Sequence, residues 1–141
     1  MSAHKHKTLA TLRRDGSPRI SGTEMDLFDG DLWFGSMLHA LKARDLLRDP
    51  RFALHGATVD EELTGGDAKI AGRAVEITDP AEFERFVKAR NDDGAPIPDE
   101  PFHLFRLDVT EVVLIRIGDP ADHLLIESWH EGKGLTSVKR R

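Results

Sequence analysis

Residues 9–37, LATLRRDGSPRISGTEMDLFDGDLWFGSM, decide how this sequence is expected to fold. Two turn signals divide the stretch. In Asp15-Gly16-Ser17-Pro18, the glycine tolerates a positive φ and the proline cannot donate a ladder hydrogen bond. Asp29-Gly30 is a dipeptide typical of a tight turn between antiparallel strands. The pattern therefore predicts three strands, over 7–12, 19–28 and 31–36.

The rest of the chain continues the strand signal around two short helices. Apolar residues recur at helical spacing over 39–48, and Asp49-Pro50 ends that helix because the residue before a proline avoids helical angles. Asp79 is a candidate N-cap, with Pro80 in the first turn, for a helix that runs to about residue 90. Further strands are expected over 51–59, 68–78, 102–108, 111–117 and 123–129, followed by a solvated tail.

These elements predict a mainly β protein with two or three short helices. The 141 residues suggest a single domain over 1–141. Strands joined by tight turns, without regular alternation of strand and helix, indicate a closed barrel or a sandwich rather than a parallel sheet.

Composition limits the function classes. The net charge of -5 disfavours nucleic acid as a partner. The sequence has no cysteine, which excludes disulfides, thiolate metal sites and cysteine nucleophiles. It has no apolar run of the length that spans a membrane and no signal-peptide pattern, so we expect a cytoplasmic protein. The seven histidines lack metal-ligand spacing, and no serine lies in a hydrolase motif.

A candidate phosphate site follows the third predicted strand. The loop after that strand leads to a helix N-terminus, where free amides and the helix dipole favour an anion. Ser36 can donate a hydroxyl, while His39 and Lys42 share one helix face. Arg19 on the preceding strand could add a bidentate contact. The alternative is that Lys42 is only a solvated surface lysine.

Two longer stretches carry a resemblance to a known family. The run 9–37 followed by 41–54, LKARDLLRDPRFAL, resembles the pyridoxamine 5′-phosphate oxidase-like split-barrel family. The shared features are a strand before an Asp-Gly-x-Pro turn, an arginine-bearing strand, an aromatic strand end and a helix with Lys42 ahead of Pro50. The later segments 68–86, 105–115 and 123–134 are also similar to members of this group, so the resemblance covers nearly the whole chain.

The resemblance implies a split barrel that forms a homodimer, with FMN or the deazaflavin coenzyme F-420 in clefts shared between subunits. It implies an oxidoreductase that passes hydride or electrons between the coenzyme and a small organic substrate, with no catalytic side chain required. The positions that match coenzyme-binding segments are Arg19 and Lys42 for the phosphate, Ser21, Gly22 and Thr23 beside the ring edge, Phe34, Gly35 and Ser36 along ring and phosphate, and Trp129 beside the partner's ring.

Departures from the family pattern keep other functions open. Glu24 and Leu41 stand where true pyridoxamine phosphate oxidases carry basic residues, so that specific activity is not expected. The alternatives are a coenzyme carrier without turnover, a haem-binding barrel with one axial histidine, or an interaction module without a cofactor. Trp129 could equally be an aromatic residue of a dimer interface.

Overall fold

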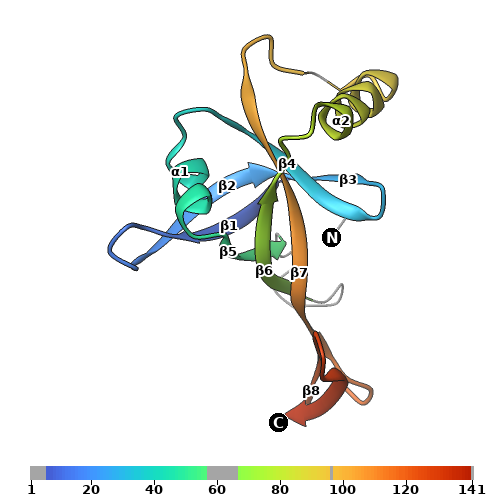
Figure 1. Ribbon diagram of the computed structural model, residues 1–141. Coiled ribbons are helices and arrows are strands. Elements are labelled where there is room, and N and C mark those ends of the chain that lie inside the picture. The colour runs from blue at the N-terminus through green and yellow to red at the C-terminus, as the bar shows by residue number, and fades with distance from the viewer. Residues whose placement is uncertain (1–5, 57–66, 96, 141) are drawn as a thin grey trace.

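A computed structural model describes residues 6–56, 67–95 and 97–140 (Figure 1). All the strands in this part of the chain belong to one antiparallel sheet. The strands are β1 (His6–Leu12), β2 (Pro18–Glu24), β3 (Asp26–Phe28), β4 (Asp31–Met37), β5 (Arg51–Gly56), β6 (Asp67–Glu76), β7 (Phe102–Ile117), β8 (Leu124–His130) and β9 (Gly134–Arg140), and the helices are α1 (Leu41–Arg48) and α2 (Pro80–Asp92).

The sheet closes into the expected split barrel. Its strands follow the order β2-β1-β5-β6-β7-β4-β3, and the two ends of this path, β2 and β3, are separated in the chain by Met25 alone. The sheet must therefore curl back on itself. The prediction of one strand over 19–28 was wrong at Met25, because the chain there leaves β1 and begins to pair with β4.

The barrel core is formed by side chains that point inward from most strands and from α1. Phe34 on β4 and Phe105 on β7 stack at a centroid distance of 5.2 Å, and both are almost completely buried. Burial of large apolar side chains provides the main driving force for folding, about 1.5–3 kcal/mol each. The buried residues of this cluster are Leu9, Met25, Phe34, Ala43, Leu46, Phe52, Leu54, Ile70, Ala74, Phe105 and Leu107.

Strand β7 is one continuous element, although the sequence predicted two strands, over 102–108 and 111–117. It pairs with β6 along most of its length, and the register shifts between Ala71 and Gly72, leaving Thr110 as an extra residue. Up to Arg106 the strand also pairs with β4, and from Glu111 it pairs with β8. The predicted gap lies at this bulge, where β7 changes neighbours without ending.

The C-terminal segment forms a hairpin that we call the arm, consisting of β8 and β9. The prediction of a tail after residue 129 was wrong, because β9 pairs with β8 from Gly134 to Arg140. The arm pairs with the second half of β7 and extends away from the two helices (Figure 1). Every residue of β9 is exposed.

The two helices pack on different parts of the barrel. α1 begins at Leu41, two residues after the predicted start, and buries Ala43 and Leu46 in the barrel core. α2 begins as predicted, since Asp79 accepts a hydrogen bond from Ala81 N at 3.1 Å. Its Phe86 stacks on Trp33 at 5.7 Å in a second, smaller cluster. Neither of these helices has the length and apolar character needed to cross a membrane.

Candidate functional site

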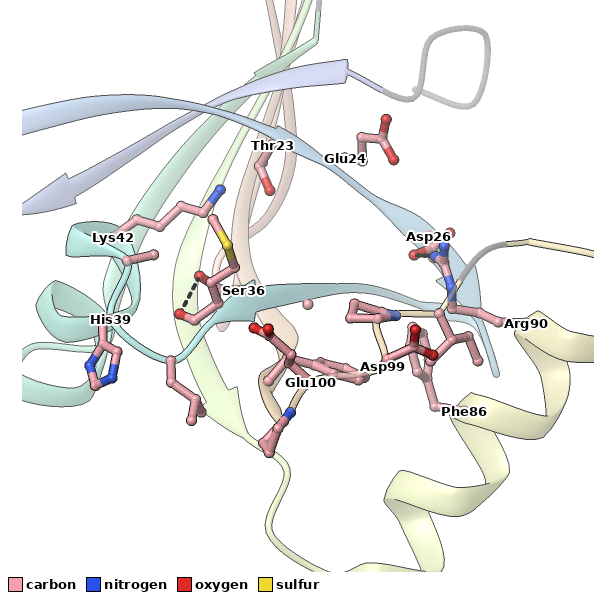
Figure 2. Close-up of a pocket in the computed structure, with 18 of the residues that line it drawn as sticks. Thr23, Glu24, Asp26, Ser36, His39, Lys42, Phe86, Arg90, Asp99 and Glu100 are labelled. Carbon is pink, nitrogen blue, oxygen red and sulfur yellow. Dashed lines mark hydrogen bonds and ion pairs between the residues drawn. The ribbon is translucent and has the colours of Figure 1, made fainter.

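A pocket of about 1260 Å³ opens between the two helices, on the side of the barrel formed by β2 and β4 (Figure 2). Its walls come from the end of β2, the end of β4, the loop that leads into α1, one face of α2 and the segment before β7. The lining residues are Gly22, Thr23, Glu24, Asp26, Gly35, Ser36, Met37, Leu38, His39, Ala40, Lys42, Phe86, Arg90, Ile97, Pro98, Asp99, Glu100, Pro101 and Phe102.

Hydroxyl groups lie at the α1 end of the pocket. Thr23 is 6% exposed and Ser36 is 5% exposed, so both are buried polar residues. Figure 2 shows the Thr23 oxygen directed into the pocket, opposite Ser36. Among the residues that the structure describes, Ser36 Oγ has one hydrogen-bond contact, a long one of 3.5 Å to Met37 O. The alternation of β4 explains this placement, because Ser36 shares its inward face with the core residue Phe34.

Lys42 provides the positive charge at the same end. Its Nζ donates a hydrogen bond to Gly22 O at 3.2 Å, which holds the ammonium beside the end of β2. Partial burial lowers the pKa of Lys42 below its ordinary value, since the charged form is less well solvated there. An anion beside Nζ would compensate this loss of hydration, so the lysine is placed to bind one.

The floor of the pocket depends on a glycine. A Cβ atom at Gly35 would lie 3.2 Å from a ring carbon of Phe102, closer than an ordinary van der Waals contact. A larger residue at this position would force the Phe102 ring to shift by a few tenths of an ångström. Gly35 therefore lets the Phe102 ring lie directly against β4 at the pocket wall.

The α2 end of the pocket is acidic. Asp26 forms an ion pair with Arg90, whose guanidinium also lies over the Phe86 ring, 5.9 Å from its centroid. Asp99 and Glu100 come from the segment before β7, and their carboxylates point into the pocket (Figure 2). The pocket thus has a cationic, hydroxyl-lined end and an acidic end.

The structure brings together five of the nine predicted site residues. Gly22, Thr23, Gly35, Ser36 and Lys42 line the pocket, as does His39 of the predicted phosphate cradle. The other four lie elsewhere: Arg19 pairs with Asp45, Phe34 is in the barrel core, Ser21 pairs with Leu9 farther along β2, and Trp129 is on the arm. Within the described residues, no group of acidic and histidine side chains could hold a metal ion.

Several lining residues were absent from the sequence prediction. Asp26, Phe86 and Arg90 come from β3 and α2, and the segment from Ile97 to Phe102 completes the wall. With Pro98 and Pro101, the sequence of that segment is typical of a loop. Its sequence carries no signal for the part of the barrel against which it lies, so only the tertiary structure identifies it.

The fold and the pocket define the class: this is a split-barrel protein with a pocket beside its first helix. Similarity to known proteins identifies the family. The chain belongs to the pyridoxamine 5′-phosphate oxidase family, whose sequence model matches residues 2–116. No curated protein matches the sequence.

Solved structures share the fold at low identity. A pyridoxamine 5′-phosphate oxidase-related, FMN-binding protein from Nostoc punctiforme has a TM-score of 0.67 at 16% identity, over 97% of this chain and 87% of that one. PhzG from Burkholderia lata, in complex with tetrahydrophenazine-1-carboxylic acid, has a TM-score of 0.66 at 15% identity, over 97% and 82%. An F420 reductase has a TM-score of 0.56 at 20% identity, over 76% and 87%.

Proposed function

We propose that this protein is an oxidoreductase that binds a flavin-type coenzyme, FMN or the deazaflavin F-420, in the pocket. The observation that carries the proposal is the convergence of Lys42, Thr23 and Ser36 at one end of the pocket. The FMN-binding protein from Nostoc punctiforme and the F420 reductase, which share the fold, support it. The coenzyme, when bound, supplies the hydride or electron chemistry.

The donors at the α1 end fit a phosphate group. Lys42 offers an ammonium, and Thr23 and Ser36 offer hydroxyls from two neighbouring walls of the pocket. A charge-assisted hydrogen bond contributes about 1.5–3 kcal/mol, roughly twice the value of a neutral one. This set is small compared with an arginine-rich phosphate site, which suits a coenzyme whose tail stays partly in solvent.

The apolar walls fit a flat aromatic ring. Met37, Leu38 and Phe102 face the pocket beside the phosphate end, and Ile97 and Pro98 continue this wall. The volume exceeds the ~300–1,000 Å³ typical of a pocket for one small ligand. It therefore leaves room for a substrate next to a coenzyme.

The chain's own residues bind and orient in this proposal. Lys42, Thr23 and Ser36 fix the phosphate end, and the apolar wall excludes water from the ring. We propose no acid, base or nucleophile among the side chains. We also propose a substrate other than pyridoxamine phosphate, because Glu24 faces the pocket where a basic residue would be needed.

We further propose a cytoplasmic homodimer with the pocket shared between two copies. The arm supports the dimer, since it carries apolar side chains on both faces. Ile115, Ile126 and Val138 lie on one face, and Trp129 and Leu135 lie on the other. The arm and the second half of β7 thus form three strands with apolar side chains on both faces, which a second copy would cover.

The proposal is tested by titrating the purified, coenzyme-free protein with FMN and, separately, with F-420, following fluorescence quenching. Tight binding of either coenzyme supports the proposal, and the preferred one identifies the redox partner for a substrate screen. Binding without turnover of any substrate would favour the coenzyme carrier. Failure of both coenzymes to bind would overturn the proposal.

A further inference from the structure

The charges around the pocket are unevenly distributed. Four carboxylates line it, from Glu24, Asp26, Asp99 and Glu100, against the two cationic groups of Lys42 and Arg90. Four negative and two positive charges leave the lining at a formal charge of -2, with His39 taken as neutral. A bound phosphate at the Lys42 end would make the pocket more negative still.

Arg90 does not offset the acidic side for a ligand. Its Nη1 is within hydrogen-bond distance of Asp26, and its guanidinium lies over Phe86. These two contacts hold Arg90 against the α2 wall. Asp99 and Glu100 are exposed residues of the pocket wall and make no ion pair with any residue that the structure describes; Figure 2 shows the Glu100 carboxylate on the Ser36 side and the Asp99 carboxylate on the α2 side.

Thr23 shows independently that the pocket is built for a ligand. The side chain is 94% buried, and its hydroxyl has no hydrogen-bond partner among the described residues. The hydroxyl oxygen itself is open to the pocket, because no fully buried side-chain nitrogen or oxygen in the described part of the chain lacks a partner. Because this hydroxyl points into the pocket, a polar atom of a bound molecule is its natural partner.

We infer that the substrate is a cationic organic molecule without phosphate, held with its positive group toward Glu100 and Asp99. The inference rests on the proposed function, since it assigns the α1 end to the coenzyme and the acidic end to the substrate. Carboxylates around a partly enclosed pocket concentrate cations and repel anions. A phosphorylated substrate would be repelled by these two carboxylates.

The inference is tested with three aromatic probes of similar shape: benzylamine, which is protonated at neutral pH, benzyl alcohol and benzyl phosphate. Binding of each to the full-length protein is measured by calorimetry, with and without saturating coenzyme. We expect benzylamine to bind most tightly and benzyl phosphate most weakly. The preference should shrink as salt is added, because the ions screen the carboxylates.

Two variants test whether Glu100 and Asp99 cause the preference for benzylamine. We expect Glu100→Gln to reduce the ratio of benzylamine to benzyl alcohol affinity by about two- to fivefold, and Asp99→Asn to act in the same direction. Glu84→Gln is the matched control, because Glu84 is an exposed residue of α2 outside the pocket and should leave the ratio unchanged.

Each outcome decides one question. Coenzyme binding with equal affinity for benzylamine and benzyl alcohol would overturn the inference and leave the proposed function standing. A benzylamine preference that Glu100→Gln and Asp99→Asn do not reduce would also overturn it. A preference that depends on Glu100 in a protein that binds neither coenzyme would overturn the proposed function instead.

Discussion

Arg19 and Asp45 form an ion pair that ties β2 to α1, with Arg19 Nε 2.8 Å from Asp45 Oδ2. The Asp45 side chain is only 4% exposed, and Thr11 Oγ1 donates to the same oxygen at 2.7 Å. Arg48 donates to the other oxygen at 3.2 Å. The carboxylate is thus surrounded by donors, and the charge of Arg19 is compensated inside the fold and not directed to the pocket.

This relationship predicts a large stability loss for Asp45→Ala. Removing the buried carboxylate leaves Arg19 and Arg48 without their partner. Because their side chains are 21% and 35% exposed, water offsets part of the roughly 3–5 kcal/mol cost of a fully buried pair, and we expect a loss of about 2–3 kcal/mol of the free energy of unfolding. Urea denaturation measures the loss. Asp49→Ala is the matched control, since Asp49 pairs with Arg51 at the surface and should cost much less. Equal losses in the two variants would show that the Asp45 network is not stabilising.

The same network predicts a pH dependence. Burial alone raises the pKa of Asp45, but the hydrogen bonds from Arg19, Thr11 and Arg48 outweigh it and hold this pKa below its ordinary value. The network therefore stabilises the fold fully above the unfolded-state pKa of Asp45, about 3.9. This stabilisation is lost as the pH falls through the lower pKa that Asp45 has in the folded state.

Urea denaturation of wild type and Asp45→Asn between about pH 6 and pH 3 checks this expectation. The stability difference between the two proteins should narrow as the pH falls. Asp49, whose pKa is lowered to about 2 by hydrogen bonds from Arg51, loses stabilisation in the same direction in both proteins, so the difference isolates Asp45. A constant difference across the range would contradict the assignment.

Thr11 and Thr23 are both buried threonines, and we expect opposite consequences from replacing them with valine. Thr11→Val removes a donor to Asp45 and should cost roughly 1.5–3 kcal/mol of stability, leaving coenzyme affinity unchanged. Thr23→Val removes a hydroxyl that has no partner among the described residues, so stability should change by less than about 0.5 kcal/mol. Its coenzyme affinity should fall by about three- to tenfold.

Thermal denaturation and coenzyme titration of both threonine variants check this expectation. Each variant serves as the control for the other, because both carry the same change from threonine to valine. A loss of stability in Thr23→Val with unchanged affinity would mean that this hydroxyl serves the fold and not a ligand.

Lys42→Ala should weaken coenzyme binding by roughly tenfold or more, since a charge-assisted contact worth about 1.5–3 kcal/mol is lost. The pKa of Lys42 is lowered by burial, so wild-type affinity should fall as the pH rises through this value, and the variant should not show that decline. Fluorescence titration at several pH values measures both effects. Lys88→Ala on the exposed side of α2 is the control, and equal affinities in the two variants would remove Lys42 from the site.

Leu135→Asp should convert the proposed dimer to a monomer. Leu135 is 70% exposed in the single chain and lies directly across from Trp129 in the arm, so an interface there would have to bury the new charge. Light scattering after size-exclusion chromatography measures the mass. Leu27→Asp is the control, because Leu27 on β3 is similarly exposed at 73%. A monomeric wild type would contradict the proposal of a dimer.

Local signals in the sequence identified most of the elements. Asp29 and Gly30 both adopt a positive φ, 53° and 80°, which is what the Asp-Gly hairpin signal requires. The bulge at Thr110 and the strand β9 left no such signal. A bulge is defined by the register of two strands distant in sequence, and β9 is exposed on both faces, so it lacks the alternation of a half-buried strand.

The candidate site was predictable where it is contiguous in sequence. Ser36, His39 and Lys42 lie within one strand-loop-helix segment, so their proximity followed from the local pattern, whereas Gly22 was expected from the family resemblance. Whether Arg90 and the segment before β7 line the pocket depends on how α2 packs against Trp33. The pairing of Arg19 with Asp45 likewise depends on how α1 docks on the barrel, which neither residue's own segment specifies.

The outer edge of the arm limits how copies of this protein can associate. Among the described strands, β9 pairs only with β8, so its other edge presents free N–H and C=O groups that could template pairing with another chain. Lys139 and Arg140 lie on that strand, and two such edges brought together would repel each other. The strand is in this way protected from open-ended aggregation, while the apolar faces of the arm remain able to form a closed assembly.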